Sequence, residues 1–197
     1  MVTLNWPNFL TVVRILLVPV LVVALLENTG DGDVLAAIVF AAASLTDFID
    51  GYLARTRNSI TTFGKLMDPL ADKLLIVAAL VALVSLHRLA AWVAMVIITR
   101  EFAVTVLRMG ATQAGVVMAA SMFGKIKTCV QIVTIMAVIA VHGRPLWLEL
   151  MIYATVIITV MSGLDYFFGL RKRINAAQSE RSSARSAGGA EAPEASR

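Results

Sequence analysis

The chain has 197 residues, of which 59% are apolar and only 15% are charged. This composition is too apolar for an ordinary soluble domain and predicts an integral membrane protein. The net charge is +4, but no basic module with interleaved aromatic residues accompanies it, so a membrane surface or an anionic substrate is favoured over nucleic acid. The single cysteine, Cys129, excludes an internal disulfide framework.

Six apolar stretches are separated by short polar connections, and each has about the length that a helix needs to cross the hydrocarbon core of a bilayer. The first stretch covers about residues 9–26, and the second begins near residue 34 and loses its apolar character after residue 46. The other four cover about residues 64–86, 89–109, 117–141 and 145–168. The sequence therefore predicts an all-α integral membrane protein, a bundle of six transmembrane helices.

The first stretch carries a polar stripe at its start. Asn8, Thr11 and Arg14 recur every third residue on an otherwise apolar segment, which places them on one side of a helix. Residues 1–8 contain no Lys or Arg, so the segment lacks the basic start of a signal peptide and is expected to be retained. Taken alone, the stripe fits an interfacial anchor and a helix start.

Four carboxylates lie at the junction of the second and third stretches: Asp47, Asp50, Asp68 and Asp72. An aspartate at the centre of a membrane helix costs about 2.5 to 3.5 kcal/mol on insertion scales, so a compensating cation is expected. Residues three or four apart share a helix face, and the spacing predicts two acidic stripes that can face each other. Oxygen ligands without His or Cys favour Mg²⁺ or Mn²⁺, and four carboxylates suffice for two ions.

Small residues accompany the carboxylates. Gly51, Ala54 and Gly64 are expected at the same level of the two helices and would leave room for a bulky ligand. Arg55 follows Ala54, and a guanidinium suits a phosphate. The alternative is a purely structural role, in which Arg55, Arg57, Lys65 and Lys73 neutralise the aspartates.

These residues resemble the signature of the CDP-alcohol phosphatidyltransferase family, D-x2-D-G-x2-A-R-x8-G-x3-D-x3-D. The sequence matches it from Asp47 to Asp72 without a departure. The resemblance implies transfer of a phosphatidyl group from CDP-diacylglycerol to an alcohol, with two divalent ions and a homodimer. It implies metal binding by Asp47, Asp50, Asp68 and Asp72, a catalytic base at Asp72, CDP-diacylglycerol binding by Asp50, Gly51, Ala54, Arg55 and Gly64, and ligand contacts at Asn8, Thr11 and Arg14.

Charged residues gather again around the connection between the fourth and fifth stretches: Arg100, Glu101, Arg108, Lys125 and Lys127. On an ideal helix Arg100 and Arg108 differ by about 80° and can converge on one anion. Lys125 and Lys127 differ by about 200°, so at most one of them is expected to point inward. The alternative is that these charges only anchor the chain at the cytoplasmic surface.

The patches around these charges resemble the branch of the family that makes phosphatidylglycerol phosphate. That resemblance implies sn-glycerol 3-phosphate as the acceptor, its phosphate bound by Arg100, Arg108, Lys125 and Lys127. An inositol phosphate or phosphatidylglycerol would be alternative acceptors. A membrane cation carrier is the alternative outside enzymes, although the other stretches offer almost no carboxylates to continue a path.

Charge asymmetry predicts the orientation. Arg88 and Arg144 fall on one side of the predicted bundle, and the other fifteen of the 17 basic residues fall on the opposite side or in spans leading to it. The positive-inside tendency then places both termini and the aspartates at the cytoplasmic face of the cell membrane. Residues 1–170 are expected to form the transmembrane domain, and residues 171–197, rich in Ser, Ala, Gly, Glu and Arg, a disordered basic tail.

Overall fold

The structure of the protein, a computed structural model, describes residues 6–27, 29–56, 62–113 and 122–189. Within them, side chains are described for residues 12–27, 29–46, 73–112, 124, 126–169 and 171.

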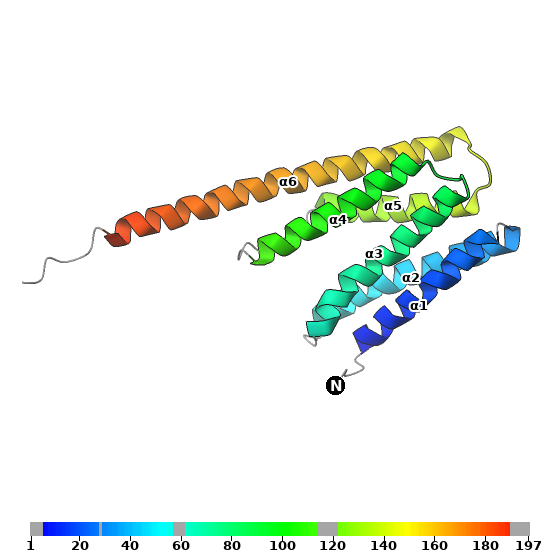
Figure 1. Cartoon of the computed structure of the whole chain (residues 1–197), viewed down its shortest axis with the longest axis horizontal. Coiled ribbons are helices and arrows are strands. Elements are labelled where there is room, and N and C mark those ends of the chain that lie inside the picture. Colours follow the sequence, from blue (N-terminus) through cyan, green and yellow to red (C-terminus); the bar gives the residue numbers. More distant parts are fainter. Residues whose placement is uncertain (1–5, 28, 57–61, 114–121, 190–197) are drawn as a thin grey trace, which may run out of the picture.

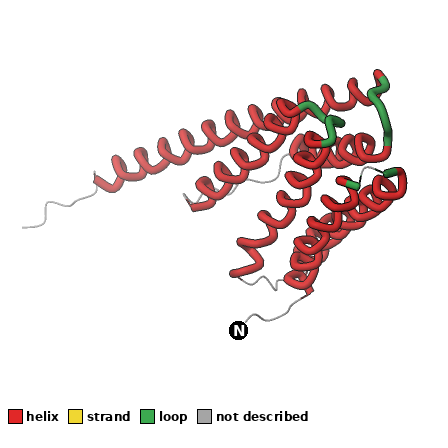
Figure 2. Tube along the Cα trace, turned by 45° about the vertical axis from the view of Figure 1, so that its right-hand side comes forward, coloured by secondary structure: helices red, strands yellow, loops and turns green. Residues whose placement is uncertain are grey.

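The described chain is all-helical, with six helices and no strand (Figures 1 and 2). The helices are α1 Trp6–Leu26, α2 Gly30–Thr56, α3 Thr62–Ser85, α4 Ala91–Gln113, α5 Met122–Ala140 and α6 Leu146–Gly189. The predicted number and order of helices are confirmed. Successive helices run in opposite directions, because short connections return the chain after each helix (Figure 1).

The start of α2 shows how local sequence sets a helix boundary. Thr29 precedes the helix, and its Oγ1 accepts a hydrogen bond of 3.1 Å from the backbone N–H of Gly32, as an N-cap residue does. Asp31 and Asp33 lie in the first turn, where negative charge is favourable to the helix dipole. A Cβ at Gly32 would lie 2.6 Å from the carbonyl oxygen of Ala24, so the close approach of α1 to this turn requires glycine.

The helices pack as two groups of three. Helix α1 packs against α2 and α3, while α6 packs against α4 and α5, and the groups meet where α2 contacts α5 and α3 contacts α4. The core at this junction consists of aliphatic side chains with Phe40 as its largest fully buried member. The burial of an apolar side on each helix explains the bundle, since each helix packs that side against its neighbours.

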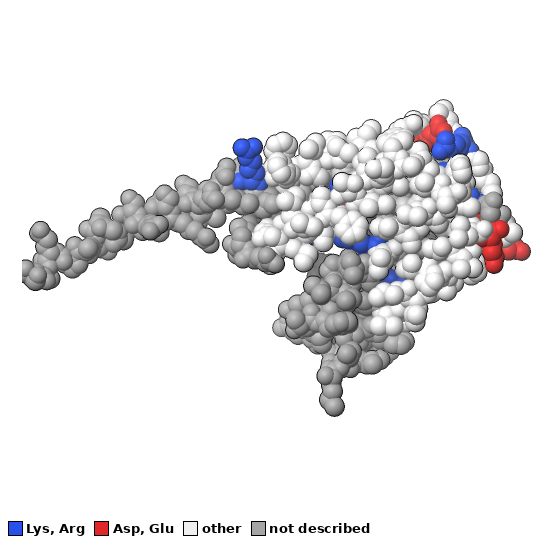
Figure 3. Space-filling view, in the orientation of Figure 1, with Lys and Arg blue, Asp and Glu red and all other residues white. Residues whose placement is uncertain are grey.

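The outward sides of the helices remain apolar. Large hydrophobic side chains on all six helices are exposed, among them Leu16, Ile38, Met95, Val133 and Ile157. In Figure 3 the described surface is almost entirely uncharged, and charged side chains gather at the end that holds the α1–α2, α3–α4 and α5–α6 connections. Of the described helical stretches, only Leu146–Gly169 is both long and apolar enough by itself to cross a membrane.

Helix α6 differs from the sequence-based expectation. The composition predicts a disordered tail from Arg171, whereas the structure continues α6 as helix to Gly189. Residues 171–189 include four Ala and four Arg, which favour helix. Because it extends an existing helix, it also avoids the cost of nucleating a new one.

A buried carboxylate ties together the end of the bundle that carries these three connections. Asp33 of α2 accepts two hydrogen bonds from Arg88, of 2.7 and 2.9 Å, and its Oδ2 lies 2.6 Å from Nε2 of His142. Arg88 also donates to the carbonyl oxygen of Ile139, at 3.3 Å. We call Asp33, Arg88 and His142 the Asp33 cluster. It joins α2, the α3–α4 connection and the α5–α6 connection.

Candidate active site

The signature residues lie on two consecutive helices at the other end of the bundle. Asp47, Asp50, Gly51, Ala54 and Arg55 belong to the last three turns of α2. Gly64, Asp68 and Asp72 belong to the first half of α3. Figures 1 and 2 both show these ends of α2 and α3 side by side. The side chains of all eight residues lie outside the described set, so their ligand roles stay predictions.

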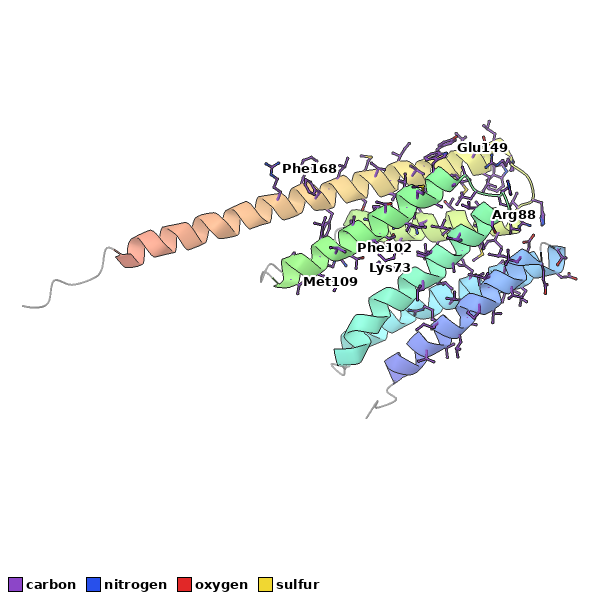
Figure 4. The ribbon with its side chains drawn as sticks, in the orientation of Figure 1. Lys73, Arg88, Phe102, Met109, Glu149 and Phe168 are labelled. Carbon is purple, nitrogen blue, oxygen red and sulfur yellow. The ribbon has the colours of Figure 1, made fainter. Side chains whose placement is uncertain are left out.

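The side chains after Asp72 are described again from Lys73 onward. Lys73 belongs to a largely buried group of charges. Its Nζ lies 3.4 Å from Oε2 of Glu101 on α4. The same carboxylate pairs through Oε1 with Lys127 of α5 and lies 3.8 Å from Nη1 of Arg100. We call Lys73, Arg100, Glu101 and Lys127 the Glu101 cluster; Figure 4 shows Lys73 where α3, α4 and α5 come together.

Both arginines of α4 contact residues of α6. Arg100 donates a hydrogen bond of 2.7 Å to Oγ of Ser162, and a Cβ at Gly163 would lie 3.3 Å from Cγ of Arg100. The guanidinium of Arg108 lies over the ring of Tyr166, 5.7 Å from its centroid. Ser162 and Tyr166 are one helical turn apart and therefore share a face of α6. The two arginines thus contact adjacent positions along α6, and their convergence on one anion stays a prediction.

Of the two lysines of α5, the structure describes the side chain of Lys127. Lys127 points inward, with only 2% of its side chain exposed, while Ile126 and Thr128 on either side of it are exposed. The side chain of Lys125 lies outside the described set. Among the N-terminal residues Arg14 is buried, at 4% exposure, and the side chains of Asn8 and Thr11 lie outside the described set.

A buried polar stripe continues from the Glu101 cluster between α5 and α6. Thr134 and Thr155 share a hydrogen bond of 2.7 Å between their hydroxyl oxygens. Gln131, one turn before Thr134 on α5, is 1% exposed, and both of its amide atoms are without a hydrogen-bond partner among the described residues. Gln131, Thr134 and Thr155 line a small cavity whose other lining residues are aliphatic. Buried polar groups are ordinarily satisfied by protein, water or ligand.

Sequence reasoning missed the central role of Glu101 in this arrangement. It identified Glu101 only as one charge among several, and considered Lys73 only as a counter-charge for the aspartates. The partners of Glu101 on other helices, Lys73 and Lys127, lie 28 residues before it and 26 after it, so no helical spacing links them. The available signal was that Glu101 is the only carboxylate of the largely apolar helix α4, because a carboxylate in such a helix requires a partner.

The arrangement defines a class of protein: an all-helical bundle with an acidic signature on two adjacent helix ends and a buried basic cluster beside it. A family model described as CDP-alcohol phosphatidyltransferase matches residues 4–161. The chain belongs to that family.

Individual relatives cover most of the chain. A Bacillus subtilis protein named CDP-diacylglycerol–glycerol-3-phosphate 3-phosphatidyltransferase is 43% identical, over 83% of this chain and 93% of its own length. A Mycobacterium tuberculosis protein named probable phosphatidylglycerophosphate synthase is 41% identical, over 82% and 79%. A Rickettsia felis protein with the same name as the Bacillus protein is 34% identical, over 85% and 96%.

Proposed function

We propose that the protein is a CDP-diacylglycerol–glycerol-3-phosphate 3-phosphatidyltransferase, an enzyme of phospholipid synthesis. It transfers a phosphatidyl group from CDP-diacylglycerol to the primary hydroxyl of sn-glycerol 3-phosphate, giving phosphatidylglycerol phosphate and CMP. The observation that carries the proposal is a complete signature on adjacent ends of α2 and α3, in a chain whose relatives of that name match it at 34 to 43% identity.

The donor set suits two divalent ions. Two helices that lie side by side at one end of the bundle carry Asp47, Asp50, Asp68 and Asp72 (Figure 1), and carboxylate oxygens are what Mg²⁺ and Mn²⁺ prefer. These four residues would hold the ions. When bound, such ions supply polarisation of the pyrophosphate and stabilise the charge of the departing CMP.

The chain's own residues bring the substrates together and move one proton. Gly51, Ala54, Arg55 and Gly64, together with Asp50, bind the cytidine diphosphate part. Asp72 removes the proton from the acceptor hydroxyl, whose oxygen forms a bond to the phosphorus of the phosphatidyl group. The bond from that phosphorus to the CMP oxygen breaks, and CMP leaves with the electron pair. A carboxylate one turn from Asp68 is suited to this role, because a base must reach past the metal ligands toward the incoming hydroxyl.

The acceptor is bound through its phosphate by Arg100, Arg108, Lys125 and Lys127. Support comes from Arg100 and Lys127, which lie in one buried cluster, and from Arg108, which lies one turn further along α6 over Tyr166. Asn8, Thr11 and Arg14 are proposed as further ligand contacts. An acceptor that carries a phosphate monoester explains several cations in an apolar bundle better than serine or choline would.

The enzyme acts in the cell membrane as a multi-pass protein, with the signature end at the cytoplasmic face, and forms a homodimer. The apolar sides of all six helices support the membrane location, as does the spanning length of Leu146–Gly169. At the cytoplasmic face the site would receive CDP-diacylglycerol from the bilayer and glycerol 3-phosphate from water.

The test is CMP release by the purified protein in detergent, with CDP-diacylglycerol and Mg²⁺ or Mn²⁺. Glycerol 3-phosphate, inositol 1-phosphate and phosphatidylglycerol are compared as acceptors. Selective turnover with glycerol 3-phosphate is expected, and its loss with EDTA and recovery with excess Mg²⁺ would support the metals. Turnover with another acceptor would overturn the acceptor assignment only. Absence of CMP release with every acceptor, in folded protein supplied with metal, would favour a cation carrier.

A further inference from the structure

Glu101 has no role in the reaction proposed above, yet it is the residue around which the buried charges are arranged. Its carboxylate meets cations from three helices: Lys73 of α3, Arg100 of α4 and Lys127 of α5. Its own side chain is 12% exposed, and those of Lys73 and Arg100 are 14% exposed. The four residues are therefore held largely away from solvent at one point in the bundle.

Lys127 depends most on this carboxylate. Its side chain is 2% exposed, and an ammonium group removed from water requires compensation by an opposite charge. A lysine side chain is also a flexible four-carbon stem that ends in a point charge, so its helix alone does not fix where the charge lies. The contact between Lys127 Nζ and Glu101 Oε1 provides both the compensation and the position.

Among the four side chains of the cluster, cations outnumber carboxylates by three to one. A single carboxylate can therefore order the three cations without cancelling their attraction for an anion. Charge-assisted hydrogen bonds to such an anion are stronger than neutral ones, provided that the donors already point the right way.

We propose that Glu101 is a positioning residue that sets Lys127, together with Lys73 and Arg100, for the phosphate of the acceptor. The inference rests on the proposed function, because it deepens the acceptor site assigned there. It adds Lys73 to that site and gives Glu101 an indirect role, exerted through Lys127. Glu101 makes no contact with the reacting atoms.

The first variant is Glu101→Gln, which keeps the size of the side chain and removes its charge. In CMP-release assays KM for glycerol 3-phosphate is expected to rise about ten-fold, the size of one charge-assisted hydrogen bond. KM for CDP-diacylglycerol is expected to stay within about two-fold, as for a group remote from that substrate. The matched control is Glu149→Gln, in the first turn of α6 at the far end of the bundle, which should change neither constant.

A double variant tests whether Glu101 acts through Lys127. Lys127→Gln is expected to raise KM for glycerol 3-phosphate more than Glu101→Gln does. Adding Glu101→Gln to Lys127→Gln should then raise KM by less than Glu101→Gln does in the wild-type protein, because one of the three cations that Glu101 positions is already gone. Additive effects would overturn the indirect role, and an unchanged or lower KM in Glu101→Gln would overturn the positioning role altogether.

Failure to fold is separated from both outcomes by a third variant. Glu101→Asp keeps the charge and withdraws it by one methylene, so it should fold and raise KM for glycerol 3-phosphate by less than Glu101→Gln does. A wild-type KM in a folded Glu101→Asp protein, together with loss of folding in Glu101→Gln, would reduce Glu101 to structural charge compensation. Absence of turnover in the wild-type protein would instead count against the proposed function.

Discussion

Two buried carboxylates, Asp33 and Glu101, organise different levels of the bundle in opposite ways. Asp33, whose side chain is 4% exposed, is held by both Nη atoms of Arg88 at 2.7 and 2.9 Å. Glu101, at 12% exposure, has three cationic neighbours, one on each of three helices. In the first case a planar guanidinium matches a carboxylate in a two-point contact. In the second a single anion is shared.

The hydrogen bonding around the two carboxylates differs as well. Arg88 also donates to a backbone carbonyl, and the connections around Asp33 close over the pair. Near the Glu101 cluster, polar atoms are buried without a hydrogen-bond partner in the described structure; they are Arg100 Nε, both amide atoms of Gln131, Thr159 Oγ1 and Tyr166 OH. The contrast is between a carboxylate saturated by one arginine and a carboxylate shared by three cations, beside which several polar atoms are buried without a hydrogen-bond partner among the described residues.

The largest expected effect is on the rate of CMP release when Asp72 of the signature is replaced. Asp72→Asn should lower the rate of CMP release by about 10² to 10⁴-fold, the usual contribution of a general base. Nucleotide binding, measured by equilibrium binding of CDP-diacylglycerol in detergent, should remain. Asp165→Asn, which alters an exposed aspartate of α6, serves as the control and should keep its activity. Undiminished turnover in Asp72→Asn would refute the role of the base.

The second prediction concerns the ion pair between Asp33 and Arg88. Asp33→Asn leaves Arg88 without its buried counter-charge and should lower the free energy of unfolding by about 3 to 5 kcal/mol. Thermal unfolding in detergent measures this, and kcat/KM per folded molecule should stay close to that of the wild type. Replacing both Asp33 and Arg88 by Leu should cost less than the single change, because no charge is left unpaired. A greater loss in the double variant would contradict this account.

A smaller effect is expected where α6 supports Arg100. Ser162→Ala removes the acceptor of a 2.7 Å hydrogen bond and leaves a guanidinium donor unsatisfied. KM for glycerol 3-phosphate should rise by about three- to ten-fold, since such a loss costs roughly 1 kcal/mol. The neighbouring Thr159 is fully buried and its hydroxyl has no partner in the described structure. Thr159→Val should therefore leave KM unchanged, and equal effects of both variants would argue against a specific role of Ser162.

The smallest effect is expected at the edge of the Asp33 cluster. His142 contacts Asp33 at 2.6 Å, but 61% of its side chain is exposed. His142→Ala should lower the free energy of unfolding by less than about 1 kcal/mol, as for an exposed ion pair, and leave the activity unchanged. A loss comparable to that of Asp33→Asn, measured by the same thermal unfolding, would show that the cluster depends on all three residues.

The sequence permitted prediction of the helix order and of the helices that carry the signature. Apolar runs interrupted by short polar connections determine both, because a bundle repeats one simple pattern. Helical spacing also predicted that at most one of Lys125 and Lys127 points inward. Lys127 is buried, and the side chain of Lys125 lies outside the described residues, so the statement about the pair stays a prediction. These inferences needed only neighbours within one helix.

Pairings between helices could not be predicted in the same way. Asp33 and Arg88 are 55 residues apart, and the sequence identified Arg88 only as a charge at the outer face. The contact of His142 with Asp33 also joins segments far apart in the sequence. The continuation of α6 beyond Arg171 was missed because composition was weighed without the helix that precedes it. Such features depend on which faces meet, and spacing along one helix does not determine that.

The length of α6 has a mechanical consequence. At about 1.5 Å of rise per residue, its 44 residues extend for about 66 Å, roughly twice the thickness of a hydrocarbon core. The part after Phe168 accounts for about 30 Å of that length. A reporter group coupled near Gly189 would thus lie well beyond the rest of the bundle. A small rotation of α6 would move this group far, so changes in its distance to the α1–α2 connection would report that rotation.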